Sequence, residues 1–167
     1  MSQKLSVVLD SSPLITMCTA KVKNEPIIYA LLNHADLTVT ERVVQEVILH
    51  HDKSDVRIAR PLMTSGQITA SPAPATPLIS DFYQISETDC GVIRLGLTMP
   101  ERITIIDDKE EYLIACRYNL RPLFLLDLLV LLATSYGLDK GTARDMVQST
   151  AKRYSPAYVA HTQFMLR

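Results

Sequence analysis

The sequence has few of the features that mark several large protein classes. It contains only three cysteines, Cys18, Cys90 and Cys116, which lie far apart with no C-x-x-C pair. We therefore expect buried free thiols in a reducing cytoplasm, because this spacing supports neither a disulfide framework nor a zinc knuckle. The sequence also has no Walker, G-x-G-x-x-G or G-x-S-x-G motif, so nucleotide binding and serine-hydrolase chemistry have no support.

Long hydrophobic runs are also missing. The apolar stretch at residues 5–9 is too short for a signal peptide and ends at Asp10. The richest run, residues 123–133, contains Asp127 and falls well below the roughly 20 residues that span a bilayer. We expect a soluble cytoplasmic protein with no membrane segment.

A strong excess of positive charge is the third missing feature. The net charge is −1, with 17 basic and 18 acidic side chains, which excludes nucleic-acid binding through bulk positive charge alone. The charges are nevertheless uneven, since acids dominate residues 80–111 and basic residues dominate from residue 140 onward. Solvated helix faces would explain this pattern as well as a binding surface would.

What the sequence does contain is a globular composition and a regular alternation of elements. Its 167 residues are 47% hydrophobic and 21% charged, which fits a single domain over residues 1–167 with C-terminal helices from about residue 139. Short apolar runs predict strands at residues 5–10, 36–40, 67–70, 102–106 and 122–126. Helices are predicted at residues 14–22, 26–33, 55–64, 78–85, 109–118, 142–153 and 156–166, with others after Thr40, Ser86 and residue 126. This alternation predicts an α/β fold with three α/β/α layers and a central parallel sheet of about five strands.

Carboxylates follow two of these strands. Asp10 ends the first strand and Asp107-Asp108 ends the one near the middle, while Glu41 and Asp89 begin helices that can reach the same edge. In open parallel sheets, binding sites form beyond the carboxyl ends of the strands. Clustered acids repel one another unless cations neutralise them, and oxygen-only ligands suit Mg²⁺ or Mn²⁺. Such a cluster is what metal-assisted phosphodiester cleavage requires.

Each acid also has a purely structural interpretation. Asp10 can be a turn former before the next helix, which Ser11 or Ser12 can cap. Asp89 fits the capping box Ser86-Glu-Thr-Asp89, and Asp108 can cap the helix that begins at Lys109. Glu46 can be a solvated helix residue. Spacing alone leaves both interpretations open.

Four segments in this order resemble the PIN-domain ribonucleases, a family that includes the VapC-type toxins. The matching segments are Val-Val-Leu-Asp10-Ser-Ser12-Pro-Leu-Ile, Glu41-Arg-Val-Val-Gln-Glu46-Val, Thr88-Asp89-Cys-Gly-Val-Ile93 and Ile-Thr-Ile-Ile-Asp107-Asp108. The likeness runs from about Val7 to Gly137, and each segment falls on the expected type of element. The fold that this resemblance implies agrees with the fold predicted from the alternation of elements.

The resemblance also implies roles for particular residues. It makes four carboxylates the catalytic ligands of Mg²⁺ or Mn²⁺: Asp10, Glu46, Asp89 and Asp107. Ser12 matches the supporting hydroxyl residue that follows the first acid, and Asp108 matches an auxiliary acid or a water-mediated metal ligand. Glu41 competes with Glu46, but the family acid usually sits further into the helix, which favours Glu46.

One motif departs from the family pattern. Many relatives have Gly-Glu-Ala-Glu where this chain has Thr88-Asp89-Cys90-Gly91. The first acid is one methylene shorter and Gly91 replaces the second. We expect this change to weaken one metal site or to leave a single ion bound. A catalytically weakened PIN-like module that binds nucleic acid or has a regulatory role is therefore the main alternative, and a DNA-directed nuclease is another.

The resemblance leads to a functional hypothesis with partners. We expect a metal-dependent endoribonuclease that acts on RNA as the toxin of a type II toxin–antitoxin pair, with a cognate antitoxin protein. The apolar content of residues 123–132 favours a homodimer, and the resemblance implies the same because relatives in this family commonly form dimers. Because the net charge is −1, the basic side chains of Arg144, Lys152 and Arg153 would have to contact RNA locally.

Overall fold

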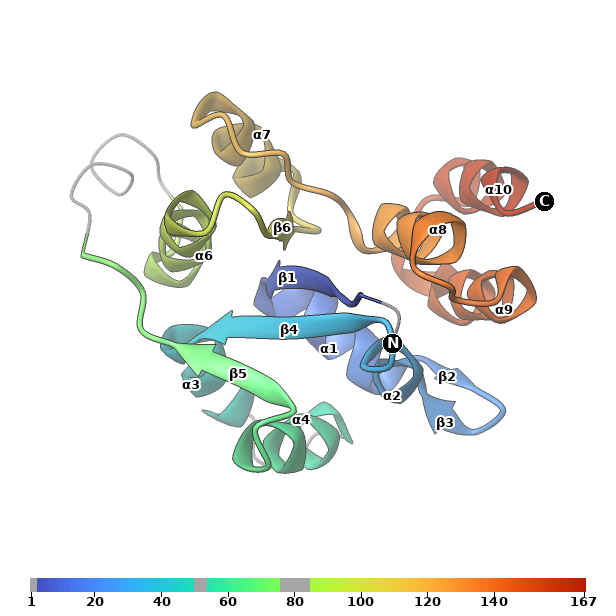
Figure 1. The fold of residues 1–167 in the computed structure, drawn as a ribbon, viewed down its shortest axis with the longest axis horizontal. Helices are drawn as coiled ribbons and strands as arrows, with labels where there is room; N and C mark the ends of the chain where they lie inside the picture. Colours follow the sequence, from blue (N-terminus) through green and yellow to red (C-terminus); the bar gives the residue numbers. More distant parts are fainter. Residues whose placement is uncertain (1–2, 50–53, 76–84) are drawn as a thin grey trace.

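The computed structural model describes residues 3–49, 54–75 and 85–167, and it contains a four-stranded sheet in the order β5-β4-β1-β6 (Figure 1). Its strands are β1 (Leu5–Leu9), β4 (Ala35–Thr40), β5 (Ile68–Ser71) and β6 (Ile103–Ile105). Every pairing in this sheet is parallel. The predicted α/β fold with a central parallel sheet is confirmed.

Strand β1 lies in the middle of this sheet. Its residue Val7 pairs with Leu37 of β4 on one side and with Ile103 of β6 on the other. The ladder continues past the end of β1, because the Asp10 amide donates to the Ile105 carbonyl at 3.1 Å. Asp10 therefore stands at the carboxyl edge of the central strand.

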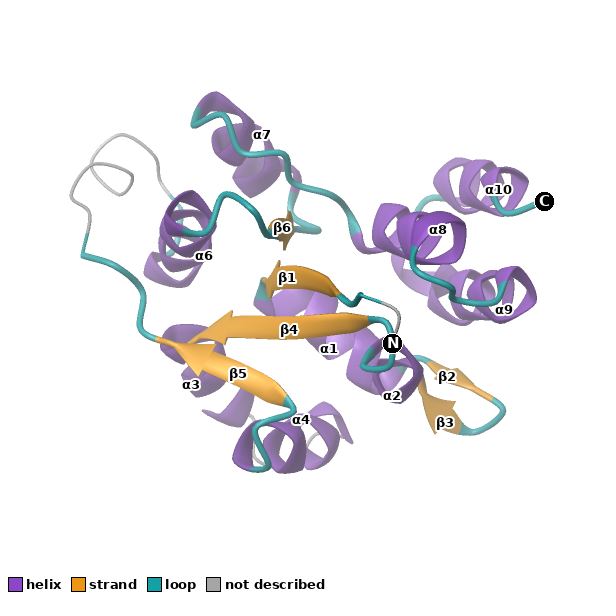
Figure 2. Cartoon of the chain, viewed as in Figure 1, coloured by secondary structure: helices purple, strands orange, loops and turns teal. Residues whose placement is uncertain are grey.

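Helices pack around the sheet (Figure 2). Among the described residues they are α1 (Ser11–Thr19), α2 (Ile27–Leu31), α3 (Glu41–Leu49), α4 (Ser54–Thr64), α6 (Glu87–Thr98), α7 (Lys109–Arg117), α8 (Leu125–Ser135), α9 (Lys140–Thr150) and α10 (Pro156–Met165). Helix α6 contacts β4, β1 and β6, whereas α3 contacts β4 and β5, and α4 contacts β5. Helices α8, α9 and α10 gather at one side of the molecule, away from α3 and α6 in Figure 1. No described helix is long and apolar enough to cross a membrane.

The strand expected at residues 122–126 is reduced to a single bridge. Leu123 pairs in parallel with Ile105, and helix α8 begins two residues later at Leu125. Pro122 has no amide hydrogen to extend the ladder, and the Leu125 amide donates to the Asp107 carboxylate instead of to a strand. The apolar run therefore continues as a helix.

Two of the predicted helices end three residues earlier than expected. The helix predicted at residues 14–22 ends at Thr19, and a hairpin of β2 (Lys21–Val22) and β3 (Glu25–Pro26) follows, with Lys23 and Asn24 in the left-handed region. The helix predicted at residues 142–153 ends at Thr150 and continues as the 3₁₀ turn η1 (Ala151–Arg153). The helix predicted at residues 78–85 falls almost entirely outside the described residues.

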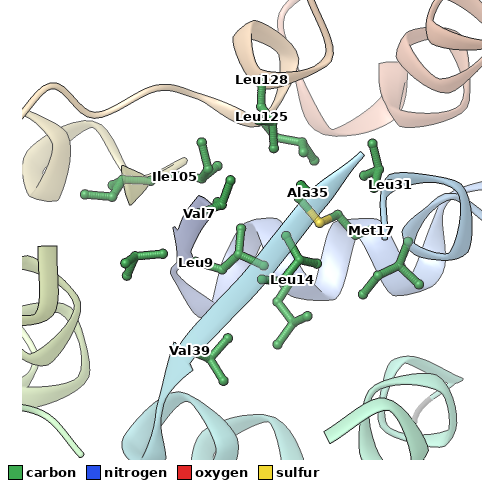
Figure 3. Packing of buried hydrophobic residues seen from close by; sticks show 14 of the residues in the cluster. Val7, Leu9, Leu14, Met17, Leu31, Ala35, Val39, Ile105, Leu125 and Leu128 are labelled. Carbon is green, nitrogen blue, oxygen red and sulfur yellow. The ribbon is translucent and has the colours of Figure 1, made fainter. Parts of the chain in front are cut away.

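Buried apolar side chains from the strands and helices form one cluster. Figure 3 shows Val7 of β1, Leu14 of α1 and Leu125 of α8 within it. Five leucines of α8 are fully buried inside this chain: Leu125, Leu126, Leu128, Leu129 and Leu132. Much of the apolar content of residues 123–132 is thus used by the core of the chain itself.

Candidate acidic metal site

Asp10 is the N-cap of α1 and is 3% exposed. Its Oδ2 accepts a hydrogen bond from the Ser12 amide at 3.3 Å, and its Oδ1 accepts one from the Ser11 hydroxyl at 3.3 Å. The expectation that Ser11 or Ser12 caps this helix is wrong, because the helix already begins at Ser11 and Asp10 provides the capping oxygen. Burial raises the pKa of Asp10 to about 6, although the amides of Ser11 and Ser12 oppose the shift.

Asp89 lies in the first turn of α6, in the predicted capping box, which is confirmed. The Asp89 amide donates to the Ser86 hydroxyl at 3.1 Å, and the Ser86 amide donates to Asp89 Oδ2 at 3.1 Å. These reciprocal bonds fix the Asp89 carboxylate at the start of the helix. Since α6 packs on β1, the helix start brings Asp89 to Asp10.

A third carboxylate, Glu111 of α7, completes a cluster with these two. One carboxylate oxygen from each of Asp10, Asp89 and Glu111 lies within 4.8 Å of the other two, and we call these residues the acidic triad. The Glu111 side chain is fully buried, and neither of its carboxylate oxygens has a hydrogen-bond partner among the described residues. The triad joins α6 and α7 to the end of the central strand.

The electrostatics of the triad favour a bound cation. Burial, together with the nearby charges of Asp10 and Asp89, raises the pKa of Glu111 to about 10. Three carboxylates so close together repel one another, and a buried carboxylate without hydrogen bonds is costly. Oxygen ligands alone are the donors that Mg²⁺ or Mn²⁺ prefers. The unpartnered oxygens of Glu111 and the all-oxygen donor set therefore fit a hard divalent ion.

Sequence reasoning missed Glu111, although a signal was present. The helix over residues 109–118 was expected, and Ile114 and Ala115, which are also buried, lie three and four residues beyond Glu111. Side chains with this spacing share one face of a helix, so Glu111 belongs to the inward-facing stripe. The adjacent Glu110 faces solvent.

Glu46 lies at the margin of the triad. It is exposed on α3, and its Oε1 is 3.5 Å from the Ser11 hydroxyl, which also contacts Asp10. Its negative charge contributes to the raised pKa of both Asp10 and Glu111. Glu46 is therefore close to the triad without being one of its members.

Asp107 lies outside the triad. Its Oδ1 accepts from the Leu125 amide at 2.9 Å, and its Oδ2 accepts from the Tyr154 hydroxyl at 2.5 Å. Burial raises the pKa of Asp107, whereas these two hydrogen bonds and the positive charge of Arg153 lower it. Asp107 thus connects β6 to the start of α8 and to the C-terminal segment.

Asp108 and Ser12 lie near Asp107. Asp108 is the N-cap of α7, and its Oδ1 accepts from the amides of Glu110 and Glu111 at 2.8 and 2.9 Å, so its structural interpretation is confirmed. Its charge also raises the pKa of Glu111. Ser12, Asp107 and Asp108 line a cavity of about 220 Å³.

The three basic residues do not form one patch around this cavity. Arg153 lines it, whereas the exposed Lys152 and Arg144 do not. The backbone carbonyl of Arg144 accepts a hydrogen bond from the Gln163 side chain on α10. Arg153 is thus the basic residue that the fold brings to the carboxylates.

Comparison with known proteins gives one positive result. A family model described as a PIN domain matches residues 6–156, which include every carboxylate discussed above. No curated protein and no solved structure matches the chain significantly. PIN domains are typically nucleases, and the parallel sheet and the acidic triad agree with that class. The chain belongs to the PIN-domain family.

Proposed function

We propose that this protein is a divalent-metal-dependent endoribonuclease whose acidic triad binds Mg²⁺ or Mn²⁺. The observation that carries the proposal is Glu111, a fully buried carboxylate with two unpartnered oxygens beside Asp10 and Asp89. A buried charge is normally paired with another charge or bound to a metal. The ion pairs seen in the described ranges, Lys4–Asp36, Arg94–Glu87 and Arg102–Glu101, do not involve the triad, which supports a cation as its partner.

The residues of the triad have separable roles in this proposal. The Ser12 amide and the Ser11 hydroxyl orient the Asp10 carboxylate, and the capping box orients Asp89. A divalent ion bound there supplies charge stabilisation for the phosphodiester and activates the attacking water. Glu46 and Asp107 are proposed as supporting carboxylates, because Glu46 shares the Ser11 hydroxyl with Asp10 and Asp107 lines a cavity with Ser12.

The biological role that we propose is that of the toxin in a type II toxin–antitoxin pair. The resemblance to VapC-type toxins supports it, and a small gene for a ribbon-helix-helix or AbrB-like protein immediately upstream would be the expected antitoxin. A homodimer stays a prediction, and burial of the α8 leucines within this chain weakens the argument made from their number. Cytoplasmic localisation also stays a prediction.

The hydrogen bonds of Asp107 and the limited room at Gly91 favour an alternative function, that of a PIN-like module without catalysis. Both oxygens of Asp107 already accept hydrogen bonds within the protein, from Leu125 and Tyr154. In addition, a Cβ added to Gly91 would lie 3.3 Å from the Ala73 Cβ, so the second acid of the family motif has little room here. This module would bind nucleic acid without cleaving it.

An RNA cleavage assay tests the proposal. We expect the purified protein to degrade RNA with Mn²⁺ or Mg²⁺ and to stop when EDTA is added. Asp10→Asn should lower the rate by on the order of 100-fold or more, because it removes one carboxylate of the triad. The fold should survive, since Asn is as good an N-cap as Asp.

The matched control is Asp36→Asn, which changes an exposed acid whose salt bridge with Lys4 has a length of 3.7 Å. This variant should cleave RNA like the parent. If Asp10→Asn is as active as the parent, the assignment of the site is wrong. If the parent binds RNA but never cleaves it with either metal, the non-catalytic module is favoured. The same assay with single-stranded DNA as the substrate tests the alternative of a DNA-directed nuclease.

A further inference from the structure

A second feature lies beside the triad, namely the cavity lined by Ser12, Asp107, Asp108, Arg153 and Tyr154, which we call the Arg153 pocket. Ser12 follows the triad member Asp10 by two residues, and its amide donates to the Asp10 carboxylate. The pocket therefore begins where the triad ends. Its volume of about 220 Å³ is large enough for a phosphate group with part of the adjoining sugar.

The acids of the pocket are already engaged with the protein. Each oxygen of Asp107 accepts one hydrogen bond, from the Leu125 amide or the Tyr154 hydroxyl, and Asp108 Oδ1 accepts two amides of α7. These donors offset part of the negative charge that would otherwise repel an anion.

Arg153 is the group of the pocket that is free to bind an anion. It is exposed and forms no salt bridge with any residue in the described ranges. It lies close enough to Asp107 to act on that carboxyl electrostatically. A guanidinium presents several N–H donors in a planar fork that matches phosphate geometry.

The backbone next to Arg153 is firmly held. The following residue, Tyr154, donates to Asp107, and its ring packs edge-on against Tyr158 at a centroid distance of 6.0 Å. Tyr158 in turn contacts Phe124, which stacks on Tyr112 of α7 at 4.5 Å. This row of aromatic rings connects the C-terminal segment to the helix that carries Glu111, so the backbone beside Arg153 is anchored to the element that supplies a triad residue.

We infer that the Arg153 pocket is a subsite for the phosphate that adjoins the cleaved bond in a single-stranded RNA, with Arg153 as its phosphate-binding residue. The inference rests on the proposed function and adds to it a place for the substrate strand. It also gives Arg153 a role in binding the substrate that Lys152 does not share. Of these two residues, Arg153 lines the pocket and Lys152 does not.

The experiment compares Arg153→Ala with the matched control Lys152→Ala, both in the Asp10→Asn background and with EDTA, so that the RNA stays intact. Binding of a fluorescent single-stranded RNA is followed by anisotropy over a series of salt concentrations. Losing one phosphate contact should reduce the slope of log affinity against log salt by about 0.7. The same relation gives roughly a fivefold loss of affinity at 0.1 M salt.

Lys152→Ala should keep the slope of the parent background. If both variants lower the slope equally, general electrostatic attraction explains the salt dependence of RNA binding without the pocket, and the inference is overturned. If Arg153→Ala binds like its background while the unmodified protein still cleaves RNA, the inference fails and the proposed function survives. If the unmodified protein neither binds nor cleaves RNA, both fail together.

Discussion

Glu111 is the side chain on which the proposed metal site depends most. It occupies a helix face that otherwise carries apolar residues, Ile114 and Ala115. Its two oxygens have no hydrogen-bond partner in the described part of the chain, so in the metal-free protein the neutral acid is favoured over the carboxylate. A bound cation reverses that preference, because ligation requires the ionised form.

The first prediction concerns the stability of the metal-free protein. The folded-state pKa of Glu111, about 10, lies above the ordinary glutamate value of 4.5, so the folded state binds more protons. The contribution of Glu111 to the free energy of unfolding is therefore complete below about pH 4.5 and is lost as the pH rises toward 10. Glu111→Gln removes this titration, so we expect a gain of roughly 1–3 kcal/mol in the free energy of unfolding at pH 7.

Denaturant unfolding in EDTA at pH 4.5 and pH 7.5 measures this effect. The gain should be small at the lower pH and clear at the higher one. Glu110→Gln is the matched control, because Glu110 is exposed on the next position of the same helix and should show no such gain. A Glu111→Gln variant that is equally destabilised at both pH values would contradict the prediction.

Two members of the triad were predicted from the sequence, and Glu111 was missed. Asp10 follows from the end of a strand, and Asp89 follows from a capping box; both are local patterns. Glu111 sits in a cluster of charged residues, Lys109-Glu110-Glu111, that looks solvated until the helix is packed. The contact between Asp107 and Tyr154 joins residues 47 positions apart, and no local pattern encodes that pairing.

At the scale of elements, the start of α6 links helix stability to the site. Asp89 contributes to the capping box through the Ser86 amide and to the triad through its carboxylate. A second helix, α10, has a serine N-cap of the same kind, in which the Ser155 hydroxyl accepts from the Tyr158 amide. The two caps therefore form a matched pair, since only one of them holds a triad residue.

The second prediction uses this pair. Ser86→Ala and Ser155→Ala should each lower the free energy of unfolding by about 1 kcal/mol, the usual cost of losing a serine cap. Only Ser86→Ala should also weaken Mn²⁺ binding, because it removes half of the capping box that orients Asp89. Calorimetric titration with Mn²⁺ and denaturant unfolding give the two readouts. Equal Mn²⁺ affinities in the two variants would show that the cap does not position Asp89.

The sequence predicted most elements well, and the errors have physical causes. The four strands of the sheet and the end of α8 near Gly137, which has a φ of 78°, follow from apolar runs and from glycine placement. The strand expected at residues 122–126 is reduced to a bridge at Leu123, because the Asp107 carboxylate accepts the Leu125 amide where α8 begins. The hairpin at β2 and β3 depends on the left-handed Lys23 and Asn24, neither of which is a glycine.

At the scale of the whole molecule, the site depends on the order of the strands. Because β1 lies between β4 and β6, Asp10 at its end lies between the carboxyl ends of these two strands. Helix α6 brings Asp89 from one part of the chain, and α7 brings Glu111 from another. The C-terminal segment reaches the same edge through the bond from Tyr154 to Asp107. A ligand held by the triad therefore connects segments that separate when the chain unfolds.

The last prediction follows from that connection. An ion that binds only the folded chain stabilises it by RT ln(1 + [L]/Kd), about 2.7 kcal/mol when the ion is at 100 times its Kd. For a chain of this length, that corresponds to a rise in Tm of roughly 5–10 °C. Thermal unfolding with millimolar Mn²⁺ or with EDTA should show this rise in the parent and in Asp36→Asn, and should lose most of it in Asp10→Asn and Glu111→Gln. A parent whose Tm is the same with Mn²⁺ and with EDTA would mean that the triad binds no ion, because a ligand that stabilises the folded state must raise its melting temperature.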